Sequence, residues 1–339
     1  MTVLITPITD TAHPSHMNSA PQPIITRRRT LSTLEYKNLS DAPPEVQWLA
    51  NLSNQKTRRA YRIDIQSFMQ FAGITNSKEL QTVKRSHILA WRCDMETQGL
   101  SGATIRRRMS ALSSLFESLC DSHDAIHNPT RGVKRPRVDC LIGKTPALSK
   151  EQARALLDAP DDLSLKGMRD KAILAMLLHH ALRREELCSL KVRDFKVLRG
   201  GSPHIRVRGK GDKIRFLPIH PESEELVTIY IVNAGHHADA DGPLFRSVSS
   251  AQKSAAVEAL TPNGIYSNVV RYYLNLLGIN GELMGPHALR CTAATCALDN
   301  QADIAQVQEW LGHTNISTTR IYDRRNFRVA DSPTFKVSY

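Results

Sequence analysis

A histidine and an arginine stand three positions apart in the segment PHALR, as His287 and Arg290. Residues at this spacing share one face of a helix. A guanidinium beside an imidazole can bind a phosphate and transfer a proton. The same pair is also compatible with a satisfied core histidine next to an unrelated arginine, so this segment leaves both interpretations open.

Four further segments hold one chemically useful side chain inside an apolar frame. They are ALRREELCSL with Arg183, RGKGDKIR with Lys210, EWLGH with His313 and TTRIYDRR with Tyr322. Each has a plain structural explanation as a surface arginine, a turn lysine, a helix-terminal histidine or one of eight tyrosines. The G-K-G segment lacks the spacing of a phosphate-binding P-loop.

Taken together and in this order, the segments resemble the tyrosine recombinase family, which includes phage integrases and chromosome-dimer resolving recombinases. The family has G-L-R-x-x-E-L, G-K-G-x-K, H-x-L-R and L-G-H segments followed by a nucleophilic tyrosine. The matching positions here are Arg183 with Glu186, Lys210, His287 with Arg290, His313, and Tyr322. The resemblance extends over residues 43–325. The sequence departs from the family pattern at two positions: Ala181 stands where the family often has glycine, and Cys291 where it often has histidine.

The resemblance implies catalysis of DNA strand transesterification. Arg183 and Arg290 suit the non-bridging oxygens of a phosphodiester, whose charge grows in the transition state. His287 can bind the phosphate and take the tyrosine proton, and His313 would add a hydrogen bond. The family assigns Tyr322 as the nucleophile that forms a 3′-phosphotyrosine and Lys210 as the general acid. Glu186 supports the arginine region.

The spacing of apolar residues predicts that most of the elements that hold these residues are helices. In residues 53–73 the pattern predicts a helix opened by Ser53 or Asn54 and closed by Gly73; its apolar stripe is Tyr61, Ile65, Phe68 and Ala72. A second predicted helix starts after Ser101, and its stripe is Ile105, Met109, Leu112, Phe116 and Leu119.

The second half of the chain begins with a predicted helix capped by Ser149, followed by a buried helix. Alternation in residues 204–219 then predicts a hairpin around the G-K-G-D turn. Its apolar positions are Ile205, Val207, Ile214, Phe216 and Pro218. The remainder, to about residue 325, is expected to be helical.

The expected fold is mainly α with a small antiparallel sheet in the C-terminal domain, arranged as a two-domain DNA clamp. We expect a flexible arm (1–42), a helical core-binding domain (43–122), a basic linker (123–147), a catalytic domain (148–328) and a C-terminal tail (329–339). Apolar residues of that tail suggest docking on a neighbouring protomer or in cis, and Tyr339 is the runner-up nucleophile.

Charge points to a polyanionic partner. The 339 residues carry a formal net charge of +12, which favours nucleic acid first and an anionic membrane second. Candidate DNA-contact residues are Arg58, Arg59, Arg106, Arg107, Arg108, Lys134, Arg135 and Arg137. The family resemblance implies that the substrate is double-stranded DNA with paired recombination sites and that the protein binds it as a homotetramer. A second recombinase or accessory DNA-bending proteins are further partners that the resemblance allows.

The six cysteines include no C-x-x-C pair, so we expect no metal site, no disulfide and no cofactor. The sequence shows no secretory signal and no apolar run long enough for a membrane span, which favours a cytoplasmic, nucleoid-associated protein. Two other functions share some of these features: a type IB topoisomerase-like enzyme, and a DNA-binding regulator with a weakened site. A basic helical scaffold would leave the ordered motifs unexplained.

Overall fold

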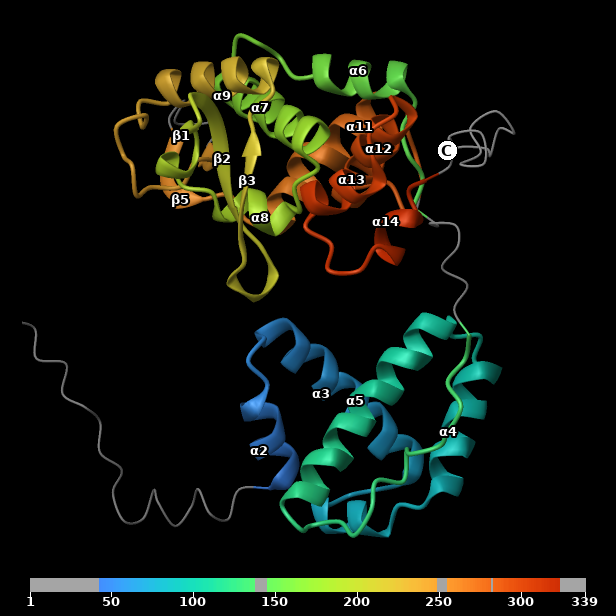
Figure 1. Ribbon diagram of the computed structural model, residues 1–339. Coiled ribbons are helices and arrows are strands. Elements are labelled where there is room, and N and C mark those ends of the chain that lie inside the picture. The colour runs from blue at the N-terminus through green and yellow to red at the C-terminus, as the bar shows by residue number, and fades with distance from the viewer. Residues whose placement is uncertain (1–42, 138–144, 249–254, 282, 324–339) are drawn as a thin grey trace, which may run out of the picture. The chain divides into compact units, whose positions relative to one another are not determined.

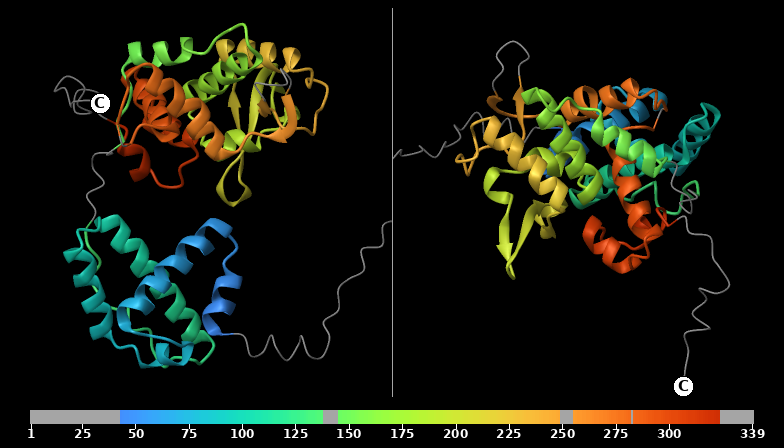
Figure 2. Two further views of the ribbon diagram at one scale, coloured as in Figure 1. Left: turned by 180° about the vertical axis from the view of Figure 1, so that it is seen from behind. Right: turned by 90° about the horizontal axis from the view of Figure 1, so that it is seen from above.

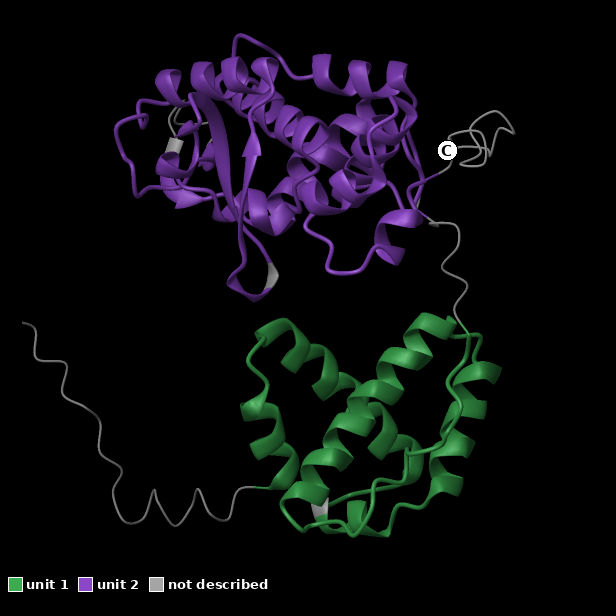
Figure 3. Ribbon diagram, viewed as in Figure 1, with its two compact units in different colours: residues 1–138 green, residues 139–339 purple. Residues whose placement is uncertain are grey.

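The computed structural model describes residues 43–137, 145–248, 255–281 and 283–323 (Figure 1). The expected arm (1–42) and tail (329–339) lie outside these residues. The chain divides into two compact units, residues 1–138 and 139–339 (Figure 3). In the described part of the chain, no helix is both long and apolar enough to cross a bilayer.

The first unit is helical. Its elements are α2 (Pro44–Asn51), α3 (Gln55–Ala72), the 3-10 helix η1 (Ser77–Thr82), α4 (Arg85–Thr97) and α5 (Gly102–Asp121). Asn54 caps α3 by accepting bonds from two main-chain N–H groups, and the left-handed Gly73 ends it. Ser101 caps α5. These limits confirm the two helices predicted from the capping residues.

The core of this unit forms along the stripes of α3 and α5. All five predicted stripe residues of α5 are buried, together with Phe68 and Trp91, whose rings pack edge to face. Ala72 is exposed, so the predicted stripe of α3 is wrong at its last position.

Residues 123–137, the start of the stretch expected as a linker, pack back on this same unit. Val133 is buried in its core. Asn128 donates to the Ser113 carbonyl oxygen and to Glu117. Thr130 in turn donates to Asn128.

The second unit is built around α7 (Leu165–His180), all of whose residues are buried or half-buried. The helices are α6 (Lys150–Asp158), α8 (Arg184–Ser189), α9 (Pro221–Asn233), α10 (Pro262–Gly264), α11 (Tyr272–Leu276), α12 (Pro286–Asp299), α13 (Ile304–Leu311) and α14 (Ser317–Arg320). The shorter helical turns are η2 (Val192–Asp194), η3 (Lys210–Asp212) and the π-helical η4 (Ile265–Arg271). Ser149 caps α6 through a reciprocal capping box, as predicted.

Two small antiparallel sheets complete this unit. The first has the order β1 (Val197–Arg199), β2 (Ser202–Arg208) and β3 (Ile214–Pro218). Its β2–β3 hairpin extends beyond the neighbouring helices of the unit (Figures 1 and 2). The second sheet pairs β4 (Arg246–Val248) with β5 (Ala255–Ala259). The prediction of a mainly helical chain with an antiparallel sheet is confirmed, whereas the expectation that everything after β3 is helical is wrong, because β4 and β5 pair there.

The pairing of β3 with β2 shows that the predicted inward-facing residues of β3 are wrong. Ile205 pairs with Leu217 and Val207 with Arg215. Since directly opposed residues share one face of a sheet, Leu217 and Arg215 face inward with the buried residues of β2. Ile214 is 52% exposed. The expected inward set of Ile214, Phe216 and Pro218 is therefore out of phase by one residue.

Candidate active site

Arg290 occupies the centre of the candidate site. It lies on α12, which starts at Pro286, a residue whose missing N–H costs nothing at the first helical position. The Arg290 residue is only 2% exposed. Its Nη1 donates to the Ala181 carbonyl oxygen, and its Nη2 donates to the Leu311 carbonyl oxygen at 2.5 Å. One guanidinium thus joins the end of α7, α12 and the end of α13.

Arg183 approaches the same place from another direction. It precedes the first turn of α8, and its Nη1 donates to Glu186 Oε1 at 2.7 Å and to the Leu311 carbonyl oxygen at 3.4 Å. Burial and the nearby charge of Arg183 lower the pKa of Arg290 to about 10. Arg290 still carries its charge at neutral pH, so two guanidiniums meet here.

His313 is held between Arg290 and the last helix. Its Nε2 lies 3.0 Å from Arg290 Nη2, and its Nδ1 lies 3.0 Å from Thr319 Oγ1. An arginine can only donate, so Nε2 is the acceptor and the ring proton of the neutral imidazole sits on Nδ1. Burial and the charges of Arg290 and Arg183 lower the pKa of His313 to about 4.

His287 stands one helical turn before Arg290 and is solvent-exposed. Partial desolvation, followed by the charges of Arg290 and Arg183, lowers the pKa of His287. Its imidazole is consequently neutral at physiological pH and able to accept a proton. The His287 ring centroid lies 6.4 Å from that of Tyr322.

Tyr322 is brought to the site but is buried, with 2% exposure. Its ring stacks near His313 at a centroid distance of 6.0 Å. It belongs to an apolar cluster with Ala181, Cys291 and Leu311. Burial raises the pKa of Tyr322, although Arg290 and Arg183 act in the opposite direction. In this state the phenol is protonated and shielded from solvent.

The two departures from the family pattern have structural roles. Cys291 fills a buried position beside Tyr322, and its Sγ lies 3.5 Å from the Thr145 carbonyl oxygen. Ala181 adopts a left-handed backbone with a φ of 48°, a conformation that glycine adopts more readily. Its carbonyl oxygen is the one that Arg290 binds.

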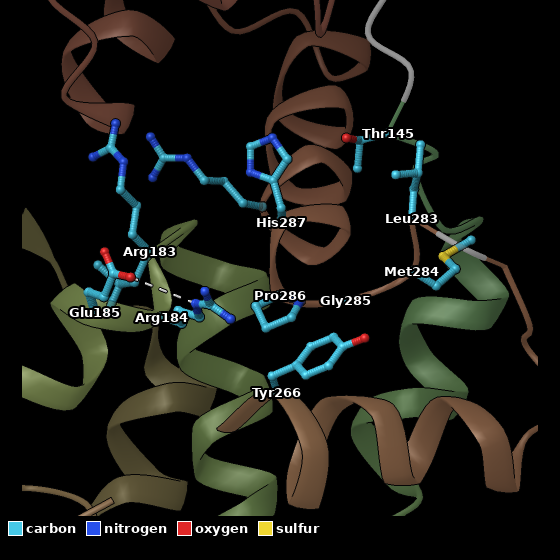
Figure 4. A pocket seen from close by; sticks show the side chains of 12 residues that line it. Thr145, Arg183, Arg184, Glu185, Tyr266, Leu283, Met284, Gly285, Pro286 and His287 are labelled. Carbon is cyan, nitrogen blue, oxygen red and sulfur yellow. Dashed lines mark ion pairs between the residues drawn. The ribbon is translucent and has the colours of Figure 1, made fainter. Parts of the chain in front are cut away.

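A hollow of about 430 Å³ opens beside these residues. Arg183, His287 and Arg290 are among its lining residues, together with Tyr266, Met284 and Pro286. Figure 4 shows the side chains of Arg183 and His287 at one side and the Tyr266 ring at the other. Tyr322 is not among the lining residues. The hollow thus presents cationic and imidazole groups to solvent while the phenol stays behind them.

Arg215 is a site residue that the sequence analysis missed. From β3 it donates to both carboxylate oxygens of Glu186, at 3.0 Å and 2.8 Å. Burial alone would raise the pKa of Glu186, but the bonds and charges of Arg215 and Arg183 outweigh burial and lower it. The buried carboxylate therefore stays ionised and links the two arginines. The strand register is the signal that reveals Arg215, because it places this residue opposite Val207.

Lys210 lies in the turn of the β2–β3 hairpin, and its side chain is outside what the structure describes. The main chain where this turn begins is next to the site. Gly209 donates its N–H to the Lys213 carbonyl oxygen at 2.8 Å. A Cβ on Gly209 would come within 3.3 Å of Arg215 Nη1 and 3.6 Å of Glu186 Oε1. The main chain leading into Lys210 is thus packed on the Glu186–Arg215 pair.

The candidate DNA-contact residues of the first unit differ in exposure and in their intramolecular partners. Arg58 donates to the main-chain carbonyl oxygens of Ala50 and Leu52, while Arg107 and Arg108 both approach the buried carboxylate of Asp64. These three side chains have intramolecular partners, and so do Arg106, which donates to the Pro136 carbonyl oxygen, and Arg135, which donates to Ser110 Oγ. The exposed candidates are Arg59, Arg106, Arg107, Lys134, Arg135 and Arg137.

Comparison with known proteins agrees with this arrangement. Residues 146–328 match the phage integrase family, and residues 46–123 match the SAM-like domain found at the N-terminus of phage integrases. The chain belongs to the phage integrase family of tyrosine recombinases. Among its relatives, tyrosine recombinase XerD of Haemophilus ducreyi is 30% identical over 281 residues, covering 81% of this chain and 89% of the relative. Tyrosine recombinase XerC of Herpetosiphon aurantiacus is 32% identical over 285 residues, covering 81% and 88%.

Solved structures share the fold of this tyrosine recombinase. The XerH site-specific recombinase, bound to its palindromic difH substrate, aligns with a TM-score of 0.60 at 23% identity, covering 79% of this chain and 76% of that one. A lambda integrase dimer bound to a COC′ core site aligns with a TM-score of 0.61 at 16% identity, covering 86% and 97%. The predicted family and enzyme class are confirmed.

Proposed function

We propose that this tyrosine recombinase cuts and rejoins duplex DNA at specific sites through a 3′-phosphotyrosine formed by Tyr322. The observation that carries the proposal is the convergence of Arg183, Arg290 and His287 at one hollow. Two guanidiniums and an imidazole form a set of donors suited to a phosphodiester and its transition state. The proposed role of His313 is a further hydrogen bond to the phosphate.

Nucleophilic attack requires the Tyr322 hydroxyl to lose a proton and reach the phosphorus atom. The neutral His287 imidazole is the proposed base. Because the phenol is buried in its cluster, Tyr322 has to leave that position when DNA is engaged. We infer that DNA binding and release of Tyr322 are linked, so the nucleophile is withheld until DNA is bound.

Lys210 is the proposed general acid for the leaving 5′-oxygen. The covalent protein–DNA bond conserves the phosphodiester energy, and attack by a 5′-hydroxyl of another strand reseals the DNA. Each step balances without ATP: a tyrosine O–P bond forms as the 5′-oxygen–P bond breaks, and the reverse follows.

The DNA partner and the assembly are also proposals. Relatives are solved with DNA substrates, and one structure shows a lambda integrase tetramer bound to a Holliday junction. We propose a homotetramer on two paired sites, with both units of each protomer contributing DNA contacts. The exposed basic residues Arg59, Arg106, Lys134, Arg135 and Arg137 are the proposed phosphate contacts of the first unit. With DNA as substrate, the proposed place of action is the cytoplasm, on the nucleoid.

The decisive test uses duplexes selected from a random library for binding to the full chain. A nicked version of the selected site should trap a covalent protein–DNA adduct that is detectable after denaturing electrophoresis. Tyr322→Phe should bind the same DNA and form no adduct, whereas Tyr272→Phe, a change at an exposed tyrosine, should behave as wild type. Adduct formation by Tyr322→Phe would overturn the assignment of the nucleophile.

A further inference from the structure

Thr319 lies in α14, three residues before Tyr322, and it is fully buried. Its Oγ1 lies 3.0 Å from Nδ1 of His313. Its main-chain carbonyl oxygen accepts from the Tyr322 N–H at 3.0 Å. One residue therefore contacts both a histidine of the site and the segment that carries the phenol.

The other contacts of His313 hold the residue without using Nδ1. Its carbonyl oxygen accepts from Gln308 Nε2 at 3.0 Å, and its ring stacks near that of Tyr322 with an angle of 27° between the planes. Its Nε2 lies 3.0 Å from Arg290 Nη2. The two ring nitrogens are thus held by different elements, Nε2 by α12 and Nδ1 by α14.

The tautomer that these contacts select does not suit a phosphate. Because Arg290 only donates, Nε2 is an acceptor, and the ring proton lies on Nδ1, where Thr319 Oγ1 accepts it. A phosphate oxygen also accepts, so a hydrogen bond from His313 to the phosphate requires a proton on Nε2. The neutral ring then releases the Nδ1 proton to water and takes one from water at Nε2, so its net charge is unchanged.

A hydroxyl group is a suitable partner for both tautomers. It accepts from a protonated Nδ1, and after rotation about its C–O bond it donates to a bare Nδ1. A carboxylate or a carbonyl oxygen in its place could only accept, which would keep the proton on Nδ1. An apolar side chain would leave the ring nitrogen unpaired at a buried contact, which disfavours either tautomer.

We propose that Thr319 is a positioning residue for the transesterification, whose hydroxyl partners Nδ1 of His313 in both tautomers and so lets Nε2 turn from an acceptor into a phosphate donor. This inference rests on the proposed function, which gives His313 its phosphate contact. The Tyr322 phenol leaves its cluster by turning about its own side-chain bonds, while the Thr319 carbonyl oxygen keeps the Tyr322 N–H. Thr319 itself makes and breaks no covalent bond.

Single-turnover adduct formation on the selected, nicked DNA separates the hydroxyl from the shape of the side chain. Thr319→Val keeps the shape, removes the hydroxyl and should slow adduct formation at least about tenfold, a part of the loss typical of one transition-state donor. Thr319→Ser keeps a group that both donates and accepts, so its rate should stay within about threefold of wild type. Thr318→Val, at the exposed neighbouring threonine of α14, is the matched control and should react as wild type.

Nitrogen-15 NMR of the histidine-labelled full chain reads the tautomer directly, and His313→Gln identifies the His313 signals by their loss. In the free chain at neutral pH, Nδ1 should be protonated and Nε2 bare. The ring N–H signal should persist in Thr319→Ser and be lost to solvent exchange in Thr319→Val. In Tyr322→Phe, which blocks cleavage, binding of the selected duplex should move the proton to Nε2.

Three results would overturn the role of Thr319: a wild-type rate in Thr319→Val, equal losses of rate in Thr319→Ser and Thr319→Val, or a proton that stays on Nδ1 when DNA is bound. The spectra of the free chain need no cleavage. Absence of any adduct in the wild type, or an adduct in Tyr322→Phe, would instead contradict the proposed function, and the spectra would still decide whether Thr319 holds His313.

Discussion

Arg183 and Arg290 donate to the same acceptor, the main-chain carbonyl oxygen of Leu311, at 3.4 Å and 2.5 Å. They come from positions 107 residues apart (290 − 183), yet a single oxygen at the end of α13 aligns both guanidiniums. Like charges so close repel each other, and the buried carboxylate of Glu186 offsets that repulsion through its bonds to Arg183 and Arg215. The cationic site is thus preorganised before a phosphate arrives.

Arg290→Lys should lower the rate of covalent adduct formation at least about a hundredfold, a loss typical of removing one transition-state donor. Lysine keeps the charge but lacks the planar fork that reaches Ala181, Leu311 and His313 together. Single-turnover cleavage of the selected DNA measures this effect. Arg193→Lys, at an exposed position of the same unit, is the control, and a rate within a few-fold of wild type for Arg290→Lys would contradict the assignment.

Arg215→Met should reduce the free energy of unfolding by about 3 kcal/mol, because it leaves the buried Glu186 carboxylate with fewer partners. The double variant Glu186→Gln with Arg215→Met should recover part of the loss, since both members of the pair are then neutral. Urea denaturation measures the free energy of unfolding of the single and the double variant.

Arg215 acts as a positioning residue, so its cleavage phenotype should differ from a simple loss of folding. At temperatures where Arg215→Met is folded, the rate of adduct formation should fall while the DNA dissociation constant stays near wild type. Arg215→Lys should restore part of the rate. Equal losses in stability for the single and double variants would exclude the charge-pair explanation.

Gly312→Ala should impair both stability and cleavage. Gly312 ends α13 with a φ of 65°, and a Cβ there would lie 3.2 Å from Arg215 Nη1. Gly235 provides the matched comparison, because its φ is 70° but a Cβ would meet nothing within 4 Å. Each substitution should cost about 1 kcal/mol of backbone strain. Only Gly312→Ala should also slow adduct formation. Equal rates of adduct formation for Gly312→Ala and Gly235→Ala would show that the close approach of Gly312 to Arg215 is unimportant for cleavage.

Acidification should destabilise the chain through His313. Its folded pKa of about 4 lies below the unfolded value of about 6.5. Above pH 6.5 both states are neutral and His313 contributes no pH dependence. As the pH falls from 6.5 to 4, the unfolded chain gains a proton that the folded chain does not, so the free energy of unfolding falls by about 1–2 kcal/mol after solvent screening.

Urea denaturation across this pH range checks the sign and the size of the effect. His313→Gln should reduce the dependence without abolishing it, because burial also lowers the pKa of His179, His180, His236 and His287. His237→Gln should leave the dependence as in wild type. The same pH dependence in His313→Gln as in wild type would show that His313 is not held neutral in the folded state.

Local sequence patterns determined much of this protein. Capping residues such as Asn54, Ser101 and Ser149 act within one helical turn, so the starts of three helices could be predicted from neighbouring residues alone. The order of the motifs was sufficient to identify the family. The structure brings together five of the residues expected to handle a phosphate, Arg183, His287, Arg290, His313 and Tyr322, while their roles in the reaction stay predictions.

Tertiary structure decided everything that depends on partners distant in sequence. Alternation along β3 has two possible phases, and only pairing with β2 turned Arg215 inward to Glu186. Asp64 likewise engaged arginines that the sequence presented as free for DNA. Whether the Tyr322 hydroxyl faces solvent depends on packing by α12 and α13, which no local pattern records.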